Sequence, residues 1–261
     1  MGINTQIKLL KKENLKQDIL KFTCLAPEIA KEVLPGQFIE IRVSKTFEPF
    51  LRRPISIHNV DKENGTIEFF FQIRGRGTEF LSQVEEGELI DVIGPLGDGV
   101  FDLKNCKNIA IIGGGIGIFP LYELAKTAIN QNVNTNVYLG FRNKDFVILE
   151  EEFSKVSNEL IIATDDGSYS KNGYAIDYLK EDVQKLNIDG IFACGPLPML
   201  QRVKEFAESQ NIYCQISLEE IMGCGIGACL GCAVKYKTET EDTFKRVCKE
   251  GPVFNALEVE I

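Results

Sequence analysis

The sequence has few of the side chains that perform acid–base and nucleophilic catalysis, with no tryptophan and a single histidine, His58. One histidine excludes a His-rich zinc hydrolase, and a Ser-His-Asp triad would need partners that the sequence around His58 does not offer. Basic residues are also scarce: 29 Lys and Arg stand against 38 Asp and Glu, for a net charge of −9. Such an acidic chain is a poor partner for nucleic acid. If the chain is an enzyme, we expect a cofactor to carry its chemistry.

Long apolar runs are missing as well. The most apolar stretch, residues 108–125, is interrupted by glycines and a proline and is too short to cross a bilayer. The first thirty residues lack the basic, apolar and small-residue succession of a signal peptide. We therefore expect a cytoplasmic protein without a membrane partner. In that reducing compartment, clustered cysteines are more often metal ligands than disulfides.

Four of the eight cysteines form a Cys-x4-Cys-x2-Cys-x15-Cys pattern that begins in "CGIGACLGC". Structural zinc sites commonly use two separated Cys-x2-Cys pairs, whereas three ligands on one loop and a distant fourth are typical of a plant-type [2Fe–2S] site. The glycines would let the loop turn tightly and direct N–H groups at the sulfurs. The pattern favours a [2Fe–2S] cluster over structural zinc or disulfides. Its ligands would be Cys224, Cys229, Cys232 and Cys248.

The other four cysteines, Cys24, Cys106, Cys194 and Cys214, are scattered over apolar segments. We expect them to be buried as small hydrophobic side chains, and only Cys194 also lies in a candidate ligand loop.

The texture of the sequence changes twice along the chain, which predicts three domains. Residues 1–103 hold short Ile-, Val- and Phe-rich runs between turns, which predicts a small antiparallel β-barrel. Residues 104–216 alternate apolar strands with helical patterns, which predicts βαβ units and a parallel sheet. Residues 217–261 contain the clustered cysteines and a short β-like tail. The predicted fold is therefore a barrel, an α/β domain and a small C-terminal cluster domain.

Three loops of the α/β domain follow predicted strands, where open α/β sheets bind ligands. The glycines of "AIIGGGIGIFP" would let backbone approach a phosphate at a helix N-terminus, although a tight turn is the alternative. The carboxylates of "ATDDGS" would accept hydrogen bonds from ribose, and the turn of "ACGPLPM" would lie over a nicotinamide or be a plain turn. The candidates are Gly113, Gly114, Gly115, Gly117, Asp165, Asp166, Cys194, Gly195 and Pro196.

Two barrel segments carry a candidate diphosphate site. In "LRRPISI", Arg53 would supply the counter-charge. In "QIRGRGTEFL", Gly77 and Thr78 would supply N–H groups where a strand leads into a helix, and Thr78 is the expected N-cap. Arginines on strands are more often solvated, so these residues alone favour the site only weakly.

The order of these motifs, Arg-Pro-Ile-Ser, then Gly-Gly-Gly-Ile-Gly, then Cys-Gly-Pro, then the cysteine loop, resembles the ferredoxin reductase superfamily. "CGIGACLGC", "RRPISI" and "ATDDGS" are similar to one branch, the electron-transfer subunits of dihydroorotate dehydrogenase B. The resemblance covers essentially the whole chain, with Phe119 before Pro120 as one departure. It implies an FAD site formed by Arg53, Pro54, Ile55, Ser56, Phe70, Phe71, Gln72, Gly77 and Thr78, and a [2Fe–2S] cluster on the four clustered cysteines.

The resemblance also implies an NAD-linked oxidoreductase subunit. Such a subunit exchanges electrons with an FMN-containing dihydroorotate dehydrogenase catalytic subunit in pyrimidine biosynthesis, as a heterotetramer of two copies of each. The alternatives are a flavin and [2Fe–2S] subunit of an electron-bifurcating transhydrogenase or of a sulfhydrogenase, and a non-catalytic iron–sulfur sensor. The residues alone leave NAD against NADP open, because Arg142 could meet a 2′-phosphate, whereas Asp165 and Asp166 would repel one. With the resemblance added, we favour NAD.

Overall fold

The computed structural model describes residues 2–16, 18–44, 46–237 and 242–261. The chain forms two compact units, and each is assembled from three stretches of sequence. The barrel unit comprises residues 1–100, 219–234 and 244–252. The sheet unit comprises residues 101–218, 235–243 and 253–261.

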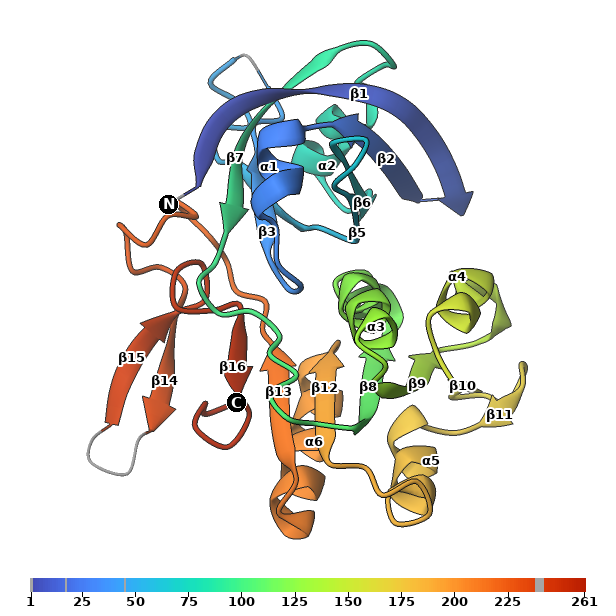
Figure 1. Cartoon of the computed structure of the whole chain (residues 1–261). Coiled ribbons are helices and arrows are strands. Elements are labelled where there is room, and N and C mark those ends of the chain that lie inside the picture. The colour runs from blue at the N-terminus through green and yellow to red at the C-terminus, as the bar shows by residue number, and fades with distance from the viewer. Residues whose placement is uncertain (1, 17, 45, 238–241) are drawn as a thin grey trace. The chain divides into compact units, whose positions relative to one another are not determined.

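The barrel unit contains an antiparallel seven-stranded sheet with strand order β4-β3-β7-β1-β2-β6-β5 (Figure 1). Strand β4, at one end of the sheet, contacts β6 near the other end, so the sheet curls into an open barrel. The predicted antiparallel barrel is confirmed. Its elements are β1 (Ile3–Lys16), β2 (Ile19–Leu25), α1 (Pro27–Glu32), β3 (Phe38–Ile41), β4 (Arg53–Ser56), β5 (Asn59–Asp61), β6 (Thr66–Gln72), α2 (Arg76–Ser82) and β7 (Leu89–Leu96).

Alternation of apolar and polar residues explains how these strands fold around one core. In β7, every second residue from Ile90 to Leu96 is buried, and in β6 the side chains of Ile67, Phe69 and Phe71 face the core. This period of two is expected for strands with one face on the core. Strand β3 is an exception, because all four of its residues are buried.

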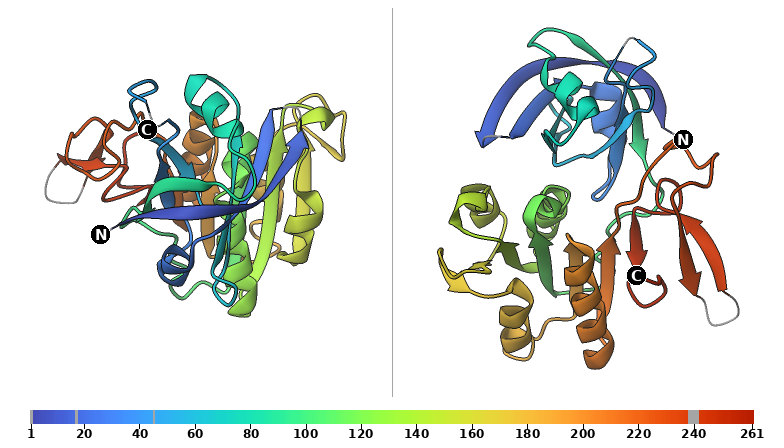
Figure 2. Two further views of the ribbon diagram at one scale, coloured as in Figure 1. Left: turned by 90° about the horizontal axis from the view of Figure 1, so that it is seen from above. Right: turned by 180° about the vertical axis from the view of Figure 1, so that it is seen from behind.

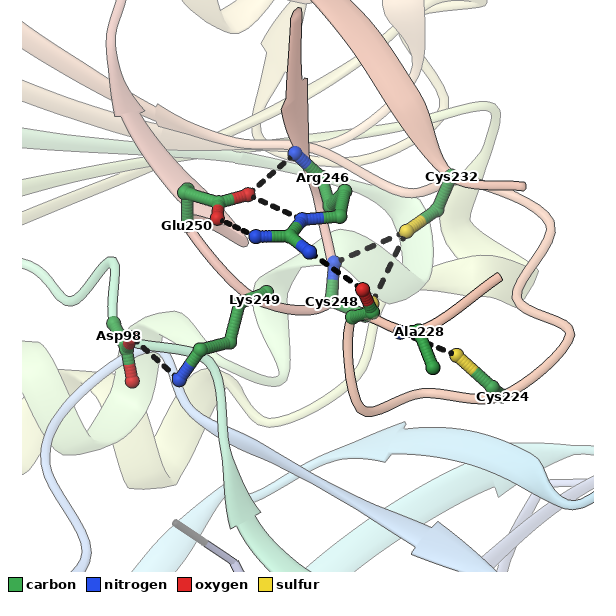
Figure 3. A network of polar contacts seen from close by, with 9 residues as sticks. Asp98, Cys224, Ala228, Cys232, Arg246, Cys248, Lys249 and Glu250 are labelled. Atoms are coloured by element: carbon green, nitrogen blue, oxygen red, sulfur yellow. Dashed lines mark hydrogen bonds and ion pairs between the residues drawn. The ribbon is translucent and has the colours of Figure 1, made fainter. Parts of the chain in front are cut away.

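Two segments of the cysteine-containing region fold against the barrel within the same unit. The N–H of Asp98 donates to the carbonyl of Lys249 at 2.7 Å, and the N–H of Gly99 donates to the carbonyl of Gly251 at 2.9 Å. The Lys249 ammonium pairs with the Asp98 carboxylate at 2.8 Å (Figure 3). The segment after β7 therefore holds the segment that contains the last clustered cysteine.

The sheet unit contains a seven-stranded sheet with strand order β11-β10-β9-β8-β12-β13-β16, seen from two further sides in Figure 2. Strands β8 to β13 pair in parallel, and β16 joins β13 antiparallel. The predicted α/β parallel sheet is confirmed. Its elements are β8 (Asn108–Gly114), η1 (Gly115–Ile118), α3 (Leu121–Asn130), β9 (Asn134–Phe141), η2 (Lys144–Phe146), α4 (Glu150–Lys155), β10 (Glu159–Thr164), β11 (Lys171–Asn172), α5 (Ala175–Asp182), β12 (Gly190–Cys194), α6 (Leu197–Gln210), β13 (Tyr213–Ser217) and β16 (Val253–Asn255).

Helices cover both faces of this sheet, which is why its central strands are continuously apolar. In β8, residues 109–112 are all buried, as expected for a parallel strand buried on both faces. The crossovers from β8 to β9 and from β10 to β12 run in opposite directions along the sheet. Because such crossovers are right-handed, they place α3 and α5 on opposite faces. The strand order reverses between β8 and β12, the position where sheets of this kind bind ligands.

A two-stranded ribbon, β14 (Ala233–Lys237) and β15 (Asp242–Arg246), completes the described structure. None of the helices within the described ranges is long and apolar enough to cross a membrane.

Candidate functional site

The four clustered cysteines lie in the barrel unit as two pairs. The sulfurs of Cys232 and Cys248 are 3.2 Å apart, and both side chains are buried. The carbonyl of Cys232 accepts a hydrogen bond from Val247 N–H at 3.0 Å, which aligns the two segments. Cys224 and Cys229 form the second pair, since Cys229 N–H donates to the Cys224 sulfur at 3.4 Å. Two cysteines for each of two irons is the ligand count of a [2Fe–2S] cluster.

Backbone N–H groups already point at these sulfurs. The Cys224 sulfur accepts from Ala228 N–H at 3.3 Å, the Cys229 sulfur from Gly231 N–H at 3.5 Å, and the Cys232 sulfur from Cys248 N–H at 3.4 Å. Burial opposes ionisation of Cys224, but N–H donors, including that of Ile226, lower its pKa to about 6. N–H groups directed at sulfur stabilise thiolate and cluster charge. The loop therefore suits an anionic iron–sulfur group.

The pairs stand apart from each other in the described structure. Within residues 2–16, 18–44, 46–237 and 242–261, no three His, Cys, Asp or Glu side chains gather closely enough to hold one metal ion. All eight cysteines are free thiols. The assignment of the four clustered cysteines as ligands of one cluster stays a prediction.

An ion pair at the end of β15 braces the cysteine loop. Arg246 donates from Nε to Glu250 at 2.9 Å, and its two terminal nitrogens donate to Glu250 and to the carbonyl of Gly227 (Figure 3). The Arg246 side chain lowers the pKa of Glu250 to about 2. Because Gly227 lies between Cys224 and Cys229, this guanidinium connects the loop to the segment that carries Cys248.

We expect Arg246→Ala to loosen the loop without unfolding the barrel. Water screens this partly exposed ion pair, so its loss should weaken the hold on the loop only modestly. Release of iron to a chelator should therefore be about two- to fivefold faster. The control is Lys235→Ala, which removes an exposed pair with Glu260 in the ribbon. Equal release rates in the two variants would contradict the bracing role.

Two predicted FAD-site residues from distant segments meet in the barrel unit. A Cβ placed on Gly77 would lie 2.1 Å from Nε and 2.6 Å from Nη2 of Arg53, so a side chain there would displace this guanidinium from α2. Arg53 also donates to the carbonyl of Leu51 at 2.7 Å. The neighbouring Arg52 faces the other way and pairs with Asp91 at 2.7 Å. Arg53 and the first turn of α2 thus form one cationic, N–H-rich corner.

The predicted N-cap of α2 is wrong. The helix is capped at Gly75, and Thr78 occupies the third helical position, where its hydroxyl accepts from Arg74 N–H at 3.0 Å and donates to the Gly75 carbonyl at 3.1 Å. The cap residue Gly75 has an extended backbone, and the Thr78 hydroxyl binds the backbone of the residues that begin the helix. Thr78 still stands at the corner formed by Arg53 and Gly77.

The predicted flavin-lining residues of β6 point to opposite faces of the sheet. The ring of Phe71 packs edge-to-face on Phe22 in the core, with ring centroids 5.0 Å apart. Phe70 points away from that core and packs on His58 at 4.8 Å. Along a strand, Gln72 shares the face of Phe70. Phe71 is therefore a core residue, and Phe70 is buried on the opposite face of the strand. Flavin contacts of these residues stay a prediction. Pro54, Ile55 and Ser56 lie on β4 and are half-buried.

The predicted nucleotide loops lie at the carboxyl ends of parallel strands in the sheet unit. The glycine loop after β8 and the Cys-Gly-Pro turn after β12 meet, because a Cβ on Gly117 would lie 2.6 Å from Cα of Gly195 and 2.8 Å from the carbonyl of Cys194. Pro196 packs over Gly114 in the same contact, since a Cβ there would lie 2.8 Å from its ring. These residues meet at the point where the strand order reverses.

Different physical reasons explain why glycine occupies each position of this loop. Gly113, Gly114 and Gly117 are required by packing against protein atoms. Gly115 has a φ of +55° and open space where a side chain would stand, so it is the member that exposes backbone. Asp165 and Asp166 follow β10 at the same edge, and hydrogen bonds from Ser168 lower the pKa of Asp166. Ligand contacts at these residues stay a prediction.

Two residues outside the ligand set qualify the sequence interpretation. Cys106 is only partly buried, whereas Cys24, Cys194 and Cys214 are buried as expected. Cys106 lies at the end of the segment that leads into β8, and this position explains why its side chain is more exposed than those of the other three cysteines. Glu40 on β3 was not anticipated as part of any site, yet it is 2% exposed. Burial raises its pKa to about 7, and the guanidinium of Arg52 opposes that rise.

Three family profiles match the chain in order. An oxidoreductase FAD-binding domain matches residues 6–101, and an oxidoreductase NAD-binding domain matches residues 111–205. The iron–sulfur cluster binding domain of dihydroorotate dehydrogenase B matches residues 219–260. The last match covers all four clustered cysteines, so the chain has FAD-binding, NAD-binding and iron–sulfur regions.

Among solved structures, a chain from an NADH-dependent reduced ferredoxin–NADP oxidoreductase, studied for flavin-based electron bifurcation, is similar at 31% identity. Its TM-score is 0.87, and the match covers 100% of this chain and 91% of that one. The ferredoxin reductase in carbazole 1,9a-dioxygenase shares the fold, at 19% identity, a TM-score of 0.69, and coverage of 81% and 67%.

Several relatives that match most of the chain carry the name dihydroorotate dehydrogenase B (NAD⁺), electron transfer subunit. The relative from Geobacillus thermodenitrificans is 43% identical, covering 86% of each chain. Those from Desulforamulus reducens and Lysinibacillus sphaericus are 38% and 37% identical, covering 90% and 95% of this chain and 89% and 95% of theirs. These identities exceed the 31% of the bifurcating enzyme, so the alternative of a bifurcating-enzyme subunit fits this chain less well. The chain belongs to the family of electron transfer subunits of NAD-dependent dihydroorotate dehydrogenase B.

Proposed function

We propose that this chain passes electrons between NAD and a separate dihydroorotate dehydrogenase catalytic subunit through FAD and one [2Fe–2S] cluster. The observation that carries the proposal is the cysteine loop. Its four thiols stand as two pairs with N–H groups directed at their sulfurs, inside a region that matches the family's cluster domain. When bound, FAD exchanges a hydride with NAD and passes electrons singly to the cluster.

In the barrel unit, the corner of Arg53 and Gly77 suits a diphosphate. The Arg53 guanidinium would neutralise its charge, and the first N–H groups of α2 would donate to its oxygens. Ser56, Phe70 and Gln72 would orient the flavin ring, and the backbone at Phe71 would complete that wall. No general base is required, because the residues only hold two cofactor rings together and exclude water.

In the cysteine loop, the four thiolates would hold the irons, with Cys224 and Cys229 on one and Cys232 and Cys248 on the other. N–H groups on the sulfurs would raise the reduction potential, because they stabilise added negative charge. The loop of Gly113–Gly117, the turn of Cys194–Pro196 and the carboxylates of Asp165 and Asp166 would bind NAD. Those carboxylates favour NAD over NADP, since a 2′-phosphate would be repelled.

The partner in this proposal is an FMN-containing catalytic subunit, in a cytoplasmic heterotetramer with two copies of each chain. Two large apolar side chains on the cysteine loop support docking there. Ile226 is 51% exposed and Leu230 is 63% exposed, on either side of Cys229. Exposed apolar groups beside an electron-transfer centre would be covered by a protein partner.

The test is to purify the full chain and record its absorbance and iron content under anaerobic conditions. We expect one FAD and two irons per chain, bleaching by NADH in preference to NADPH, and electron transfer to a co-expressed FMN subunit that oxidises dihydroorotate. A protein without flavin would overturn the proposal. Electron delivery to a hydrogenase or ferredoxin partner instead of dihydroorotate oxidation would support the alternative subunits.

A further inference from the structure

Strand β3 differs from the other barrel strands because both of its faces are covered. Ile39 and Ile41 point into the barrel core and are fully buried. Glu40 alternates with them and so points away from the core, yet it is only 2% exposed. A carboxyl on the outer face of a barrel strand is normally solvated. Some other segment must therefore cover Glu40.

The covering segment is the cysteine loop. A Cβ on Gly225 would lie 2.3 Å from Oε1, 2.4 Å from Cγ and 2.6 Å from Cδ of Glu40. The Glu40 side chain thus packs against the backbone of the residue that follows Cys224. Gly225 also has a φ of +68°, so any side chain there would meet both a carboxylate and an unfavourable backbone conformation.

Strand β3 also borders the predicted flavin site. Its neighbour in the sheet is β4, and Glu40 stands opposite Pro54 in that pairing, next to Arg53. A single residue of β3 therefore touches the cysteine loop with its side chain while its backbone pairs with the flavin motif. Glu40 joins the two places in which the proposed function locates FAD and the cluster.

We propose that Glu40 is a positioning residue, whose side chain seats the cysteine loop on the flavin barrel through its contact with Gly225. The inference rests on the proposed function and adds a specific requirement of shape. A side chain at residue 225 would displace either the Glu40 side chain or the loop, unless residue 40 is shortened. Hydrogen bonds from residues 98 and 99 to residues 249 and 251 hold the other end of the cluster segment. Arg246 braces the loop at Gly227, and Glu40 contacts it at Gly225.

The experiment compares variants of the holoprotein by stopped-flow reduction with NADH, which follows flavin and cluster bands separately. In Gly225→Ala we expect unchanged flavin reduction, unchanged iron content and cluster reduction slowed about tenfold, because a displacement of about 1 Å is costly for transfer between held groups. Amide hydrogen exchange in residues 223–231 should become faster, because the loop no longer packs against the Glu40 side chain. The double variant Glu40→Ala with Gly225→Ala should recover most of the rate of cluster reduction and most of the protection from amide exchange.

Two controls separate shape from other effects. Gly227→Ala carries a similar backbone strain, with φ of +83°, and its Cβ would meet the side chains of Lys249 at 3.0 Å and Arg246 at 3.3 Å but not that of Glu40. Glu40→Gln keeps the shape and removes the charge, so cluster reduction should stay within about twofold of the parent. The inference is overturned if Gly225→Ala behaves like Gly227→Ala, if the double variant shows no recovery, or if Glu40→Gln is as slow as Gly225→Ala. A parent chain without flavin or iron defeats the proposed function itself.

Discussion

Cys229→Ser is expected to abolish the iron–sulfur absorbance while leaving reduction of FAD by NADH intact. Thiolates are the ligands that iron–sulfur clusters select, and a serine oxygen is a poor replacement. Loss of a ligand should lower cluster affinity by at least about 100-fold, because even outer-shell changes cost 10- to 100-fold. Electron delivery to the partner subunit should then fall to background. Cys229 is exposed, so the substitution should leave the barrel folded.

The matched control is Cys106→Ser, which changes a partly buried thiol far along the sequence from the loop. It should retain iron, flavin and electron delivery. Iron analysis, the visible spectrum and NADH titration of each protein distinguish the possibilities. A native cluster spectrum in Cys229→Ser, or zinc in place of iron in the parent protein, would rule out the ligand assignment.

Arg53→Ala is expected to weaken FAD binding by about 1.5–3 kcal/mol, which is roughly 10- to 150-fold in Kd. The substitution removes the guanidinium that lies against Gly77, and with it a charge-assisted contact to a diphosphate. Flavin occupancy after gel filtration and dilution measures the loss.

The control is Arg76→Ala, one residue before Gly77, whose guanidinium forms a solvent-exposed pair with Glu48 at 3.0 Å. Such pairs contribute little, so flavin should stay bound. Arg52→Ala should instead lower barrel stability, because Arg52 pairs with Asp91 and donates to its carbonyl at 3.1 Å. Equal flavin loss in the Arg53 and Arg76 variants would contradict a specific role for Arg53.

Local sequence predicted the features that depend on local chemistry. The spacing of the cysteines indicated one segment with directed N–H groups, and those groups are present at Cys224 and Cys229. Strand and helix periodicity located the parallel sheet and the loops at its carboxyl edge. Arg53 and Gly77 were linked only as a weak site, and the structure brings their atoms together.

Features that depend on distant contacts were missed. Strand β1 is rich in Lys, and only Ile7 and Leu9 of its residues are buried, so its pattern does not resemble a strand. Its pairing with β2 and β7 decides its conformation. Glu40 lies between two isoleucines, a pattern typical of a strand whose polar residue faces solvent. Its burial comes from a loop some 185 positions later in the chain, near Gly225, which no local pattern contains.

The two units share the C-terminal region in alternate pieces, because the chain passes between them after residues 100, 218, 234, 243 and 252. The iron–sulfur segment is consequently not a detachable cassette. A graft of residues 217–261 onto another flavoprotein would carry β16 away from its neighbour β13 and the cysteine loop away from Glu40. Gene fusions and domain exchanges in this family should therefore succeed only when whole chains are moved, with new segments added beyond either end.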